Sequence, residues 1–470
     1  MEIEVILDVE GEYYNKAEYV VRNLLFPYSD KFVITDKYNA NSLINKKIIY
    51  CSENSSYLNK DISSNNLYVV LENSTVNYYS YPASYNEKDI VYINKMPCLF
   101  PVRSKSIAQV QKNIMAFDVF AASFFFLACW QEYTIKDRDS KGRIPLKYTI
   151  QNKLNIIRVP IVNEYLIILE KYISDLWGVQ LKYKMLPGQR SCFVALSHDI
   201  DHIDYSFVRY VRHLKSNRRI IEKNMSNLFN TATNIFKKKN VFKELANIEL
   251  RLNVASTNFF FSEYERKYRS YADSLVRYFN EIGFEVGHHI SDKCILDGSL
   301  DEDTANFNYN VKNITGERVH TLRFETHKLF TQIEGYSYCY DNSLLFAEDL
   351  GYRTGFTYPH YIYDPINERP FKVLAIPLNV MDTTLVDRKY LYLDDDIAEK
   401  VLVNFIRSFI QYGGVLSVLF HQGFFWLNTD KRLKMYERLL QLFKEQDVKV
   451  GTCRDVYLWY RKMCDPQKST

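Results

Sequence analysis

Short apolar runs alternate with polar turns along residues 1–110. The runs EVILDV, KFVITD, KIIYC and LYVVLEN have the length and composition of strands, and YNKAEYVVRNLLF repeats apolar residues at helical spacing. This pattern predicts a small α/β domain at the start of the chain. The domain contains no group of residues that suggests catalysis.

Residues 111–189 are predicted to be mainly helical and to continue the N-terminal domain. The stretch FDVFAASFFFLACWQEY is apolar almost all round, which is typical of a buried helix, and VNEYLIILEKYISDLW repeats apolar residues every three or four positions. Between them, KDRDSKGR reads as a charged turn exposed to solvent.

From residue 190 to residue 465, strand-like and helix-like segments alternate. Strand candidates such as CFVALS, STNFFF, FEVGHH, HTLRF, VLAIPL and GVLSVLFH are separated by other segments, many of them helical in pattern. The alternation argues for parallel β/α architecture, and seven or eight such units over this length suit a barrel better than an open sheet. In barrels of this kind the chemistry gathers at the C-terminal ends of the strands.

Length and charge narrow the classes of function. A chain of 470 residues is long for one average domain and suggests two or three units, or one large barrel with an appendage. The 60 basic and 56 acidic residues leave a net charge of +4, which is too small to imply nucleic acid or an anionic membrane as the default partner. The eight cysteines form no CxxC pair, so reduced thiols in the core are the simplest interpretation.

Targeting signals are not evident. The most apolar stretch, 117–130, is too short to cross a bilayer, and acids stand near the N-terminus where a signal peptide needs basic residues. A cytoplasmic location is therefore expected. The basic stretches 209–224 and 237–240 leave contact with a membrane surface or a lipid-linked glycan open, although a solvated helical face is the simpler interpretation.

The segment LSHDIDHID, 196–204, ends an apolar strand with a cluster of titratable residues. Side chains two positions apart on a strand point the same way, so Asp199 and Asp201 are expected to face one side, with His198 and Ile200 on the other. In the alternative interpretation both aspartates only cap the following helix, since Asp is a common N-cap residue.

Further acids and histidines stand at the ends of other predicted strands. These are His288 and His289 in FEVGHH, Arg323, Glu325 and His327 at the end of HTLRF, Asp382 after IPLNVM, and His421 after VLSVLF. One histidine at a strand end is more often structural than catalytic. Several of them at different strand ends indicate a shared site.

These residue types suit metal-assisted hydrolysis. A catalytic zinc site uses three carboxylate or imidazole ligands and leaves a position for water. The ion lowers the pKa of the water and polarises a carbonyl, a second carboxylate takes the water's proton, and a histidine protonates the leaving group. Two acids at i and i+2 supply one ligand and one base side by side.

The C-terminal part of the chain resembles the polysaccharide deacetylases, the NodB-homology carbohydrate esterases of family 4, through SHDID, an Asp-x-Asp variant of the first motif. The whole chain resembles a bacterial subgroup with an uncharacterised N-terminal domain, through the ordered set DVFAASFFFLACWQEY, DSKGR, RVPIVNEY, SHDIDH, STNFFF, FEVGHH, YDNSLLFAEDLGYRTG, IPLNVMDTTL and FHQ. The resemblance implies a distorted (β/α) barrel after a smaller α/β domain. It also implies removal of an acetyl group from an N-acetylated sugar of surface or capsular glycans, with zinc as the expected divalent metal.

The resemblance also implies roles for single residues. Asp199 would be the general base, and His421 would protonate the leaving amine with Asp382 as its orienting partner. Asp201 and His289 would be metal ligands, and Arg323 or Arg353 would contact the base or the substrate.

One position departs from the pattern of the family. The usual second histidine, four residues after the first, is Lys293 here, and a protonated lysine is a poor metal ligand. His327 is the expected replacement, and His288 is less suitable because adjacent residues on an extended segment point opposite ways. With two ligands only, the chain would be a glycan-binding protein without catalysis. A metal hydrolase of another amide or ester is the further alternative.

Overall fold

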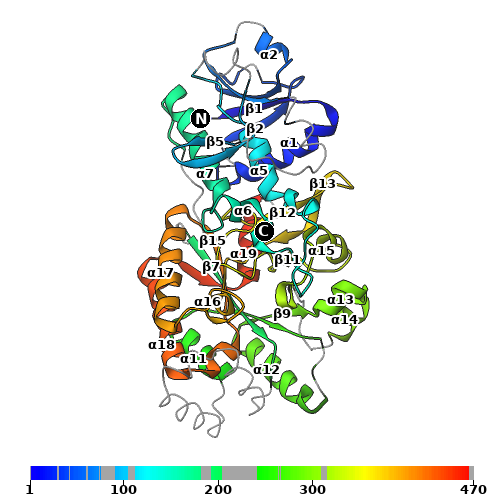
Figure 1. The fold of residues 1–470 in the computed structure, drawn as a ribbon, viewed down its shortest axis with the longest axis vertical. Helices are drawn as coiled ribbons and strands as arrows, with labels where there is room; N and C mark the ends of the chain where they lie inside the picture. Colours follow the sequence, from blue (N-terminus) through cyan, green and yellow to red (C-terminus); the bar gives the residue numbers. More distant parts are fainter. Residues whose placement is uncertain are drawn as a thin grey trace.

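The computed structural model describes residues 2–28, 31–41, 43–59, 62–72, 75, 90–103, 112–181, 192–203, 241–262, 264, 266–307 and 315–464. The basic stretches 209–224 and 237–240 lie outside these residues. Within the described part, no helix has both the length and the apolar character that a membrane span requires. We refer to the described residues up to 181 as the N-terminal unit and to those from 192 onwards as the barrel (Figure 1).

The N-terminal unit is built on a parallel sheet with the order β2-β1-β3-β4. Its strands are β1 (Ile3–Asp8), β2 (Phe32–Asp36), β3 (Lys47–Ser52) and β4 (Asn66–Leu71), and β5 (Ile90–Ile93) and β6 (Met96–Leu99) form a separate antiparallel pair. Its helices are α1 (Gly11–Leu24), α2 (Ser56–Asn59), α5 (Val119–Leu127), α6 (Ile150–Lys153) and α7 (Ile161–Trp177), with 3₁₀ turns η1 (Phe26–Tyr28), η3 (Trp130–Tyr133) and η4 (Leu146–Tyr148).

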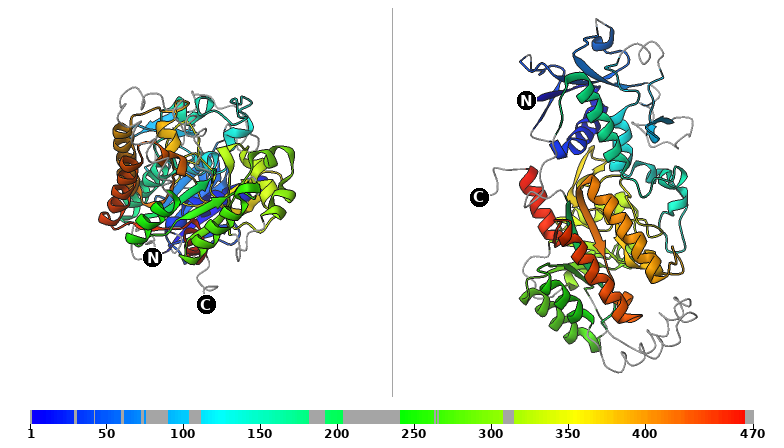
Figure 2. Two further views of the ribbon diagram at one scale, coloured as in Figure 1. Left: turned by 90° about the horizontal axis from the view of Figure 1, so that it is seen from below. Right: turned by 90° about the vertical axis from the view of Figure 1, so that its left-hand side faces the viewer.

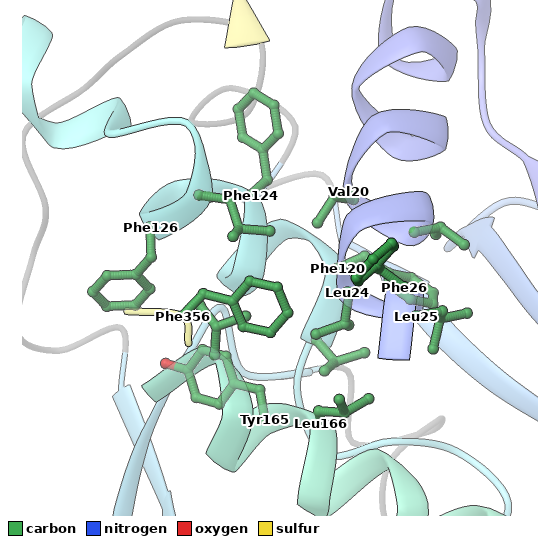
Figure 3. Packing of buried hydrophobic residues seen from close by; sticks show 14 of the residues in the cluster. Val20, Leu24, Leu25, Phe26, Phe120, Phe124, Phe126, Tyr165, Leu166 and Phe356 are labelled. Atoms are coloured by element: carbon green, nitrogen blue, oxygen red, sulfur yellow. The ribbon is translucent and has the colours of Figure 1, made fainter. Parts of the chain in front are cut away.

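Helix α5 holds the two parts of the molecule together. All of its residues are buried, as its uniformly apolar sequence predicts. The Asp118 carboxylate caps it by accepting hydrogen bonds from the backbone N–H groups of Phe120 and Ala121. Figure 3 shows side chains of α1, α5 and α7 meeting Phe356 of the barrel in one apolar cluster. The core of the N-terminal unit therefore continues into the barrel.

The barrel contains, among the described residues, one ten-stranded sheet with the order β12-β13-β11-β10-β9-β8-β7-β15-β14, to which β16 is added beside β7. All pairs are parallel except β12 with β13. The strands are β7 (Cys192–Ile200), β8 (Thr257–Phe260), β9 (Glu285–Ile290), β10 (Gly316–Val319), β11 (Tyr340–Asp341), β12 (His360–Asp364), β13 (Arg369–Ala375), β14 (Val380–Met381), β15 (Gly414–Leu419) and β16 (Lys449–Gly451).

Helices cover the outside of this sheet. Figure 2 shows α17 and α18, in orange, along one side of the barrel, where their apolar residues share a core with β7 and β15. The helices of the barrel are α11 (Val241–Arg251), α12 (Arg269–Glu281), α13 (Asp292–Asp297), α14 (Leu300–Asn306), α15 (Thr326–Ile333), α16 (Asp382–Val386), α17 (Asp395–Tyr412), α18 (Thr429–Glu445) and α19 (Cys453–Cys464), with 3₁₀ turns η6 (Arg266–Tyr268), η7 (His320–Leu322) and η8 (Gln422–Trp426).

Hydrogen bonds across the interior show that the sheet curls. In the sheet order, β11 and β15 are separated by β10, β9, β8 and β7. The amide of Asn342, directly after β11, nevertheless donates a hydrogen bond to Ser417 Oγ on β15 at 2.9 Å. Among the described residues no pairing joins β12 to β14, so the barrel is distorted and incompletely closed. The predicted α/β class, a distorted (β/α) barrel after a smaller α/β unit, is confirmed.

Candidate active site

Strand β7 directs Asp199 into the barrel and His198 to the outside. The strand is buried along its whole length, and Ser197 and Asp199 both contact Arg318 in the interior. His198 points the other way, where its Nε2 lies 2.8 Å from Glu249 of α11 and its Nδ1 lies 2.8 Å from the carbonyl oxygen of Phe420. The alternation expected from the sequence is therefore present at the end of β7.

Asp199 is held by a buried arginine. Arg318, on β10, donates from Nη1 to Asp199 Oδ1 at 2.6 Å, and its Nη2 donates to Ser197 Oγ at 2.8 Å. Burial alone would raise the pKa of Asp199, but Arg318, His289 and His421 together lower it. Asp199 is therefore ionised near neutral pH, with one oxygen bound to the arginine and the other directed into the site.

Asp201, His289 and His320 form a candidate metal-binding cluster, because each offers a ligand atom within 4.8 Å of the other two. Asp201 follows β7, His289 belongs to β9, and His320 follows β10. His289 Nε2 lies 3.1 Å from Asp201 Oδ1. One carboxylate and two imidazoles are a ligand set that zinc uses in catalytic sites, so the donor chemistry fits a divalent transition metal.

The hydrogen bonds behind both histidines fit this role. His289 Nδ1 lies 2.9 Å from the carbonyl oxygen of Arg318, which can only accept, so Nδ1 carries the proton and Nε2 faces Asp201. His320 Nδ1 lies 3.2 Å from the carboxylate of Asp292. Metal-binding histidines generally donate their second ring N–H to a carbonyl or carboxylate in this way.

The pKa shifts within the cluster also fit metal binding. Burial would raise the pKa of Asp201, but the hydrogen bond from His289 and the nearby charges of His421 and His320 bring it well below its usual value. Burial likewise opposes the charged form of His289, but Asp199 and Asp201 raise its pKa. The site therefore concentrates negative charge where a cation would be bound.

The turn that carries His320 has a strained backbone. Thr321 has a φ of 55° and Leu322 a φ of 53°, a left-handed conformation that L-residues rarely adopt. Strain of this kind persists where the surrounding structure fixes a residue, and it clusters at functional sites.

His421 and Asp382 form a second pair beside the cluster. Asp382 accepts hydrogen bonds from His421 Nδ1 at 2.6 Å and from the backbone N–H of His421 at 2.7 Å. His421 Nε2 faces the aspartates, 3.7 Å from Asp199 Oδ2 and 3.9 Å from Asp201 Oδ2. Burial opposes protonation, but Asp382, Asp201 and Asp199 raise the pKa of His421 to about 10. His421 is therefore a proton donor at neutral pH.

Two cavities open on the cluster. One has a volume of about 610 Å³ and includes the aromatic side chains of Phe261, Tyr264 and Tyr268 in its lining. The other has a volume of about 200 Å³ and is lined in part by His421 and by residues after β14. Asp201 and His320 line both cavities, so the candidate metal ligands lie between them.

His327 does not belong to the cluster, which corrects the expectation that it replaces the missing ligand. It lies on α15, where its Nε2 is 2.9 Å from the carbonyl oxygen of Ala128 and its ring packs on Tyr133 with the centroids 3.9 Å apart. Burial lowers the pKa of His327 to about 4. Its ring joins the barrel to the N-terminal unit.

The two arginines predicted to contact the base or the substrate have other partners in the structure. Arg353 is buried between Phe324 and Phe346 and forms a paired hydrogen bond with Glu132 at 2.9 Å from both Nε and Nη2. Arg353 is therefore a structural link to the N-terminal unit, which corrects its assignment. Arg323 Nη1 lies 3.5 Å from Asp292, so Arg323 lies behind His320 and does not contact Asp199.

Arg318 and His320 are the functional candidates that the sequence analysis missed. Both belong to the segment GERVH, 316–320. The expected strand HTLRF is a 3₁₀ turn, and the real strand β10 ends at Val319. Because HTLRF ends five residues after the real strand, it favours His327 as the third ligand. A histidine following the short apolar and charged run GERV was the available signal.

Comparisons with known proteins found one family model and several solved structures. A family of unknown function, DUF7033, matches residues 9–178, which lie within the N-terminal unit. A search of curated proteins found no match. Among solved structures, a "probable Polysaccharide deacetylase" from Pseudomonas aeruginosa PAO1 shares 14% identity, covering 63% of this chain and 97% of that chain with a TM-score of 0.44.

Two further solved structures are similar over the same extent. An allantoinase shares 13% identity over 60% of this chain and 93% of its own, with a TM-score of 0.41. A family 4 carbohydrate esterase from Streptomyces lividans, in complex with acetate, shares 11% identity over 56% of this chain and 93% of its own, with a TM-score of 0.31.

Proposed function

We propose that the protein is a metal-dependent hydrolase that removes an acetyl group from an N-acetylated sugar, in surface or capsular glycan metabolism. One observation carries the proposal: three groups of residues meet at the same point. These are the arginine-held carboxylate of Asp199, the candidate ligands Asp201, His289 and His320, and the pair formed by His421 and Asp382.

Asp199 is the proposed general base. Its Oδ1 is bound to Arg318, while its Oδ2 faces the cluster and lies 3.7 Å from both His289 Nε2 and His421 Nε2. This second oxygen can accept a proton from a water molecule between the three groups. A divalent metal held by Asp201, His289 and His320 would supply Lewis-acid polarisation of the acyl carbonyl and lower the pKa of that water.

His421 is the proposed general acid. An amide does not release its amine as an anion, so the nitrogen needs a proton as the carbon–nitrogen bond breaks. His421 Nε2 faces the same point as Asp199 Oδ2, and Asp382 fixes the ring through Nδ1 and keeps it protonated. The base and the acid are therefore separate groups on different strands, each with its own orienting partner.

The sugar is the part of the proposal that rests most on the resemblance of the motifs. The two cavities that meet at Asp201 and His320 together offer aromatic faces, hydroxyl groups and carboxylate groups, which suits a sugar ring. The non-catalytic alternative rested on Lys293 leaving two ligands. His320 offers a third ligand from a different strand, so that objection loses its basis. A metal hydrolase that acts on another amide or on an ester would use the same groups. A panel of substrates distinguishes it from a sugar deacetylase.

Acetate release tests the proposal directly. The full-length chain, loaded with zinc, is expected to release acetate from N-acetylated amino sugars, to lose this activity in a chelator, and to regain it when the metal is restored. The panel includes acetylated sugar esters and simple N-acetyl amides. Turnover of the non-sugar amides alone would replace the substrate class, and sugar binding without any acetate release would favour the non-catalytic alternative.

A further inference from the structure

The charged turn at residues 139–143 reaches the candidate site. The composition of KDRDSKGR predicts a solvated turn on the surface. In the structure Lys141 and Arg143 instead line the cavity of about 200 Å³ together with His421, Asp201 and His320. A loop of the N-terminal unit therefore forms one wall of a cavity that the barrel alone would leave incomplete.

The turn is built to hold Lys141 in place. The carboxylate of Asp139 accepts the backbone N–H groups of Lys141 at 2.8 Å and Arg143 at 2.9 Å, and Gly142 has a φ of +78°, which favours glycine. The Arg143 guanidinium also lies 2.7 Å from Asp139. The turn is therefore closed on itself, and Lys141, at its tip, is half-buried.

Arg143 fastens the turn to the barrel. Its Nη1 donates to the hydroxyl of Tyr390 at 3.1 Å and to the carbonyl oxygen of Thr321 at 3.3 Å. Thr321 is the residue directly after the candidate ligand His320. The turn thus has a fixed position relative to the metal ligands.

The cavity has an excess of cationic side chains on this wall. Lys141, Arg143 and Lys389 all line it, and Arg143 is paired within the turn. Among the described residues, neither Lys141 nor Lys389 has a side-chain hydrogen bond or a salt bridge. Burial lowers the pKa of Lys141 most, the charges of Arg143 and Lys389 lower it further, and the carboxylates of Asp292 and Asp139 offset this only in part. The carboxylate of Asp387, which also lines the cavity, accepts a hydrogen bond from the backbone N–H of Lys389. Gathering like charges in a partly buried cavity is unfavourable unless an anion offsets them.

We propose that this wall is an anion subsite, and that the substrate is an N-acetylated sugar carrying a phosphate or carboxylate group. The inference rests on the proposed function for its orientation, because His421, which would protonate the leaving amine, lines the same cavity. The amino sugar then lies with its acetamido group at the cluster and its anionic group against Lys141 and Lys389. The N-terminal unit thereby selects the substrate.

Binding measurements on the full-length, zinc-loaded chain test the subsite without requiring turnover. The probes are N-acetylglucosamine, its 1-phosphate, its 6-phosphate and an N-acetylated hexosaminuronic acid. At least one anionic probe is expected to bind about tenfold more tightly than the neutral sugar, and Lys141→Met and Lys389→Met should each reduce this preference. Lys136→Met is the matched control, since Lys136 is exposed on the same segment outside the cavity.

The outcomes separate this inference from the proposed function. Equal binding of neutral and anionic probes by the wild type, or an unchanged preference in both Lys141→Met and Lys389→Met, would overturn the anion subsite even if acetate is released. An anionic preference that depends on Lys141, with no acetate release from any probe, would retain the subsite and overturn the deacetylase. The preferred probe distinguishes phosphate from carboxylate.

Discussion

Replacing Asp199 by asparagine is expected to lower kcat for acetate release by about 10²–10⁴-fold, the usual contribution of a general base. Asparagine has the same shape but cannot take a proton from water. Asp199 is not one of the three candidate ligands, so the metal content should stay at the wild-type level. Acetate release and elemental analysis on the same protein sample measure both effects.

The matched control for this variant is Asp395→Asn. Asp395, at the start of α17, forms another buried ion pair, with Arg432 Nη2 at 2.8 Å, and it belongs neither to the candidate ligands nor to the lining of the two cavities at the site. Both substitutions leave a buried arginine without its carboxylate partner, and both are expected to reduce stability. Only Asp199→Asn should reduce kcat of the folded protein. A loss smaller than tenfold in Asp199→Asn, or an equal loss in Asp395→Asn, would remove Asp199 from the role of base.

Replacing His421 by alanine is expected to lower kcat for an N-acetylated sugar by a similar factor, about 10²–10⁴-fold, because the leaving amine then has no proton donor. With an aryl acetate as substrate, the same variant is expected to lose far less activity, since a phenolate leaves without a proton. The ratio of the two losses isolates the acid role. Equal losses on both substrates would show that His421 acts by another route.

The pH profile supplies a second check on His421. Its protonated form is the active one, and with a pKa of about 10 this form persists through neutral pH. Burial opposes protonation, so removing the charge of Asp382 should lower the pKa of His421. Asp382→Asn is therefore expected to move the alkaline fall in kcat to lower pH.

The fold and part of the site can be predicted from local sequence patterns. The apolar run of β7 and the i, i+2 spacing of Asp199 and Asp201 are properties of a single buried strand, so sequence alone places both side chains inside the barrel. His289 and His421 are predictable in the same way, because His289 lies near the end of β9 and His421 follows β15, two strands with clear apolar patterns. Parallel strands then bring their C-terminal ends together without further information.

Arg318 and His320 were not accessible because β10 is short and carries charged residues. Its four residues, GERV, are all buried, yet Glu317 and Arg318 break the apolar run that marks a strand. Arg318 is tolerated there only because Asp199, Ser197 and Asn342 satisfy it from other strands. Tertiary contacts of this kind leave no local signal.

The turn at 139–143 was misjudged for a related reason. Its composition, rich in charge with one glycine, is that of an ordinary surface loop. What brings it to the cavity is the packing of the N-terminal unit on the barrel through α5 and through the contacts of Arg143 with Tyr390 and Thr321.

The proposed metal site is tested most directly by the metal content of the purified protein after incubation with zinc, in the wild type, in His320→Ala and in His327→Gln. About one equivalent of metal is expected in the wild type and in His327→Gln, and its loss is expected in folded His320→Ala, since a catalytic site needs three protein ligands. No metal in the wild type, or full metal in His320→Ala with loss in His327→Gln, would contradict it.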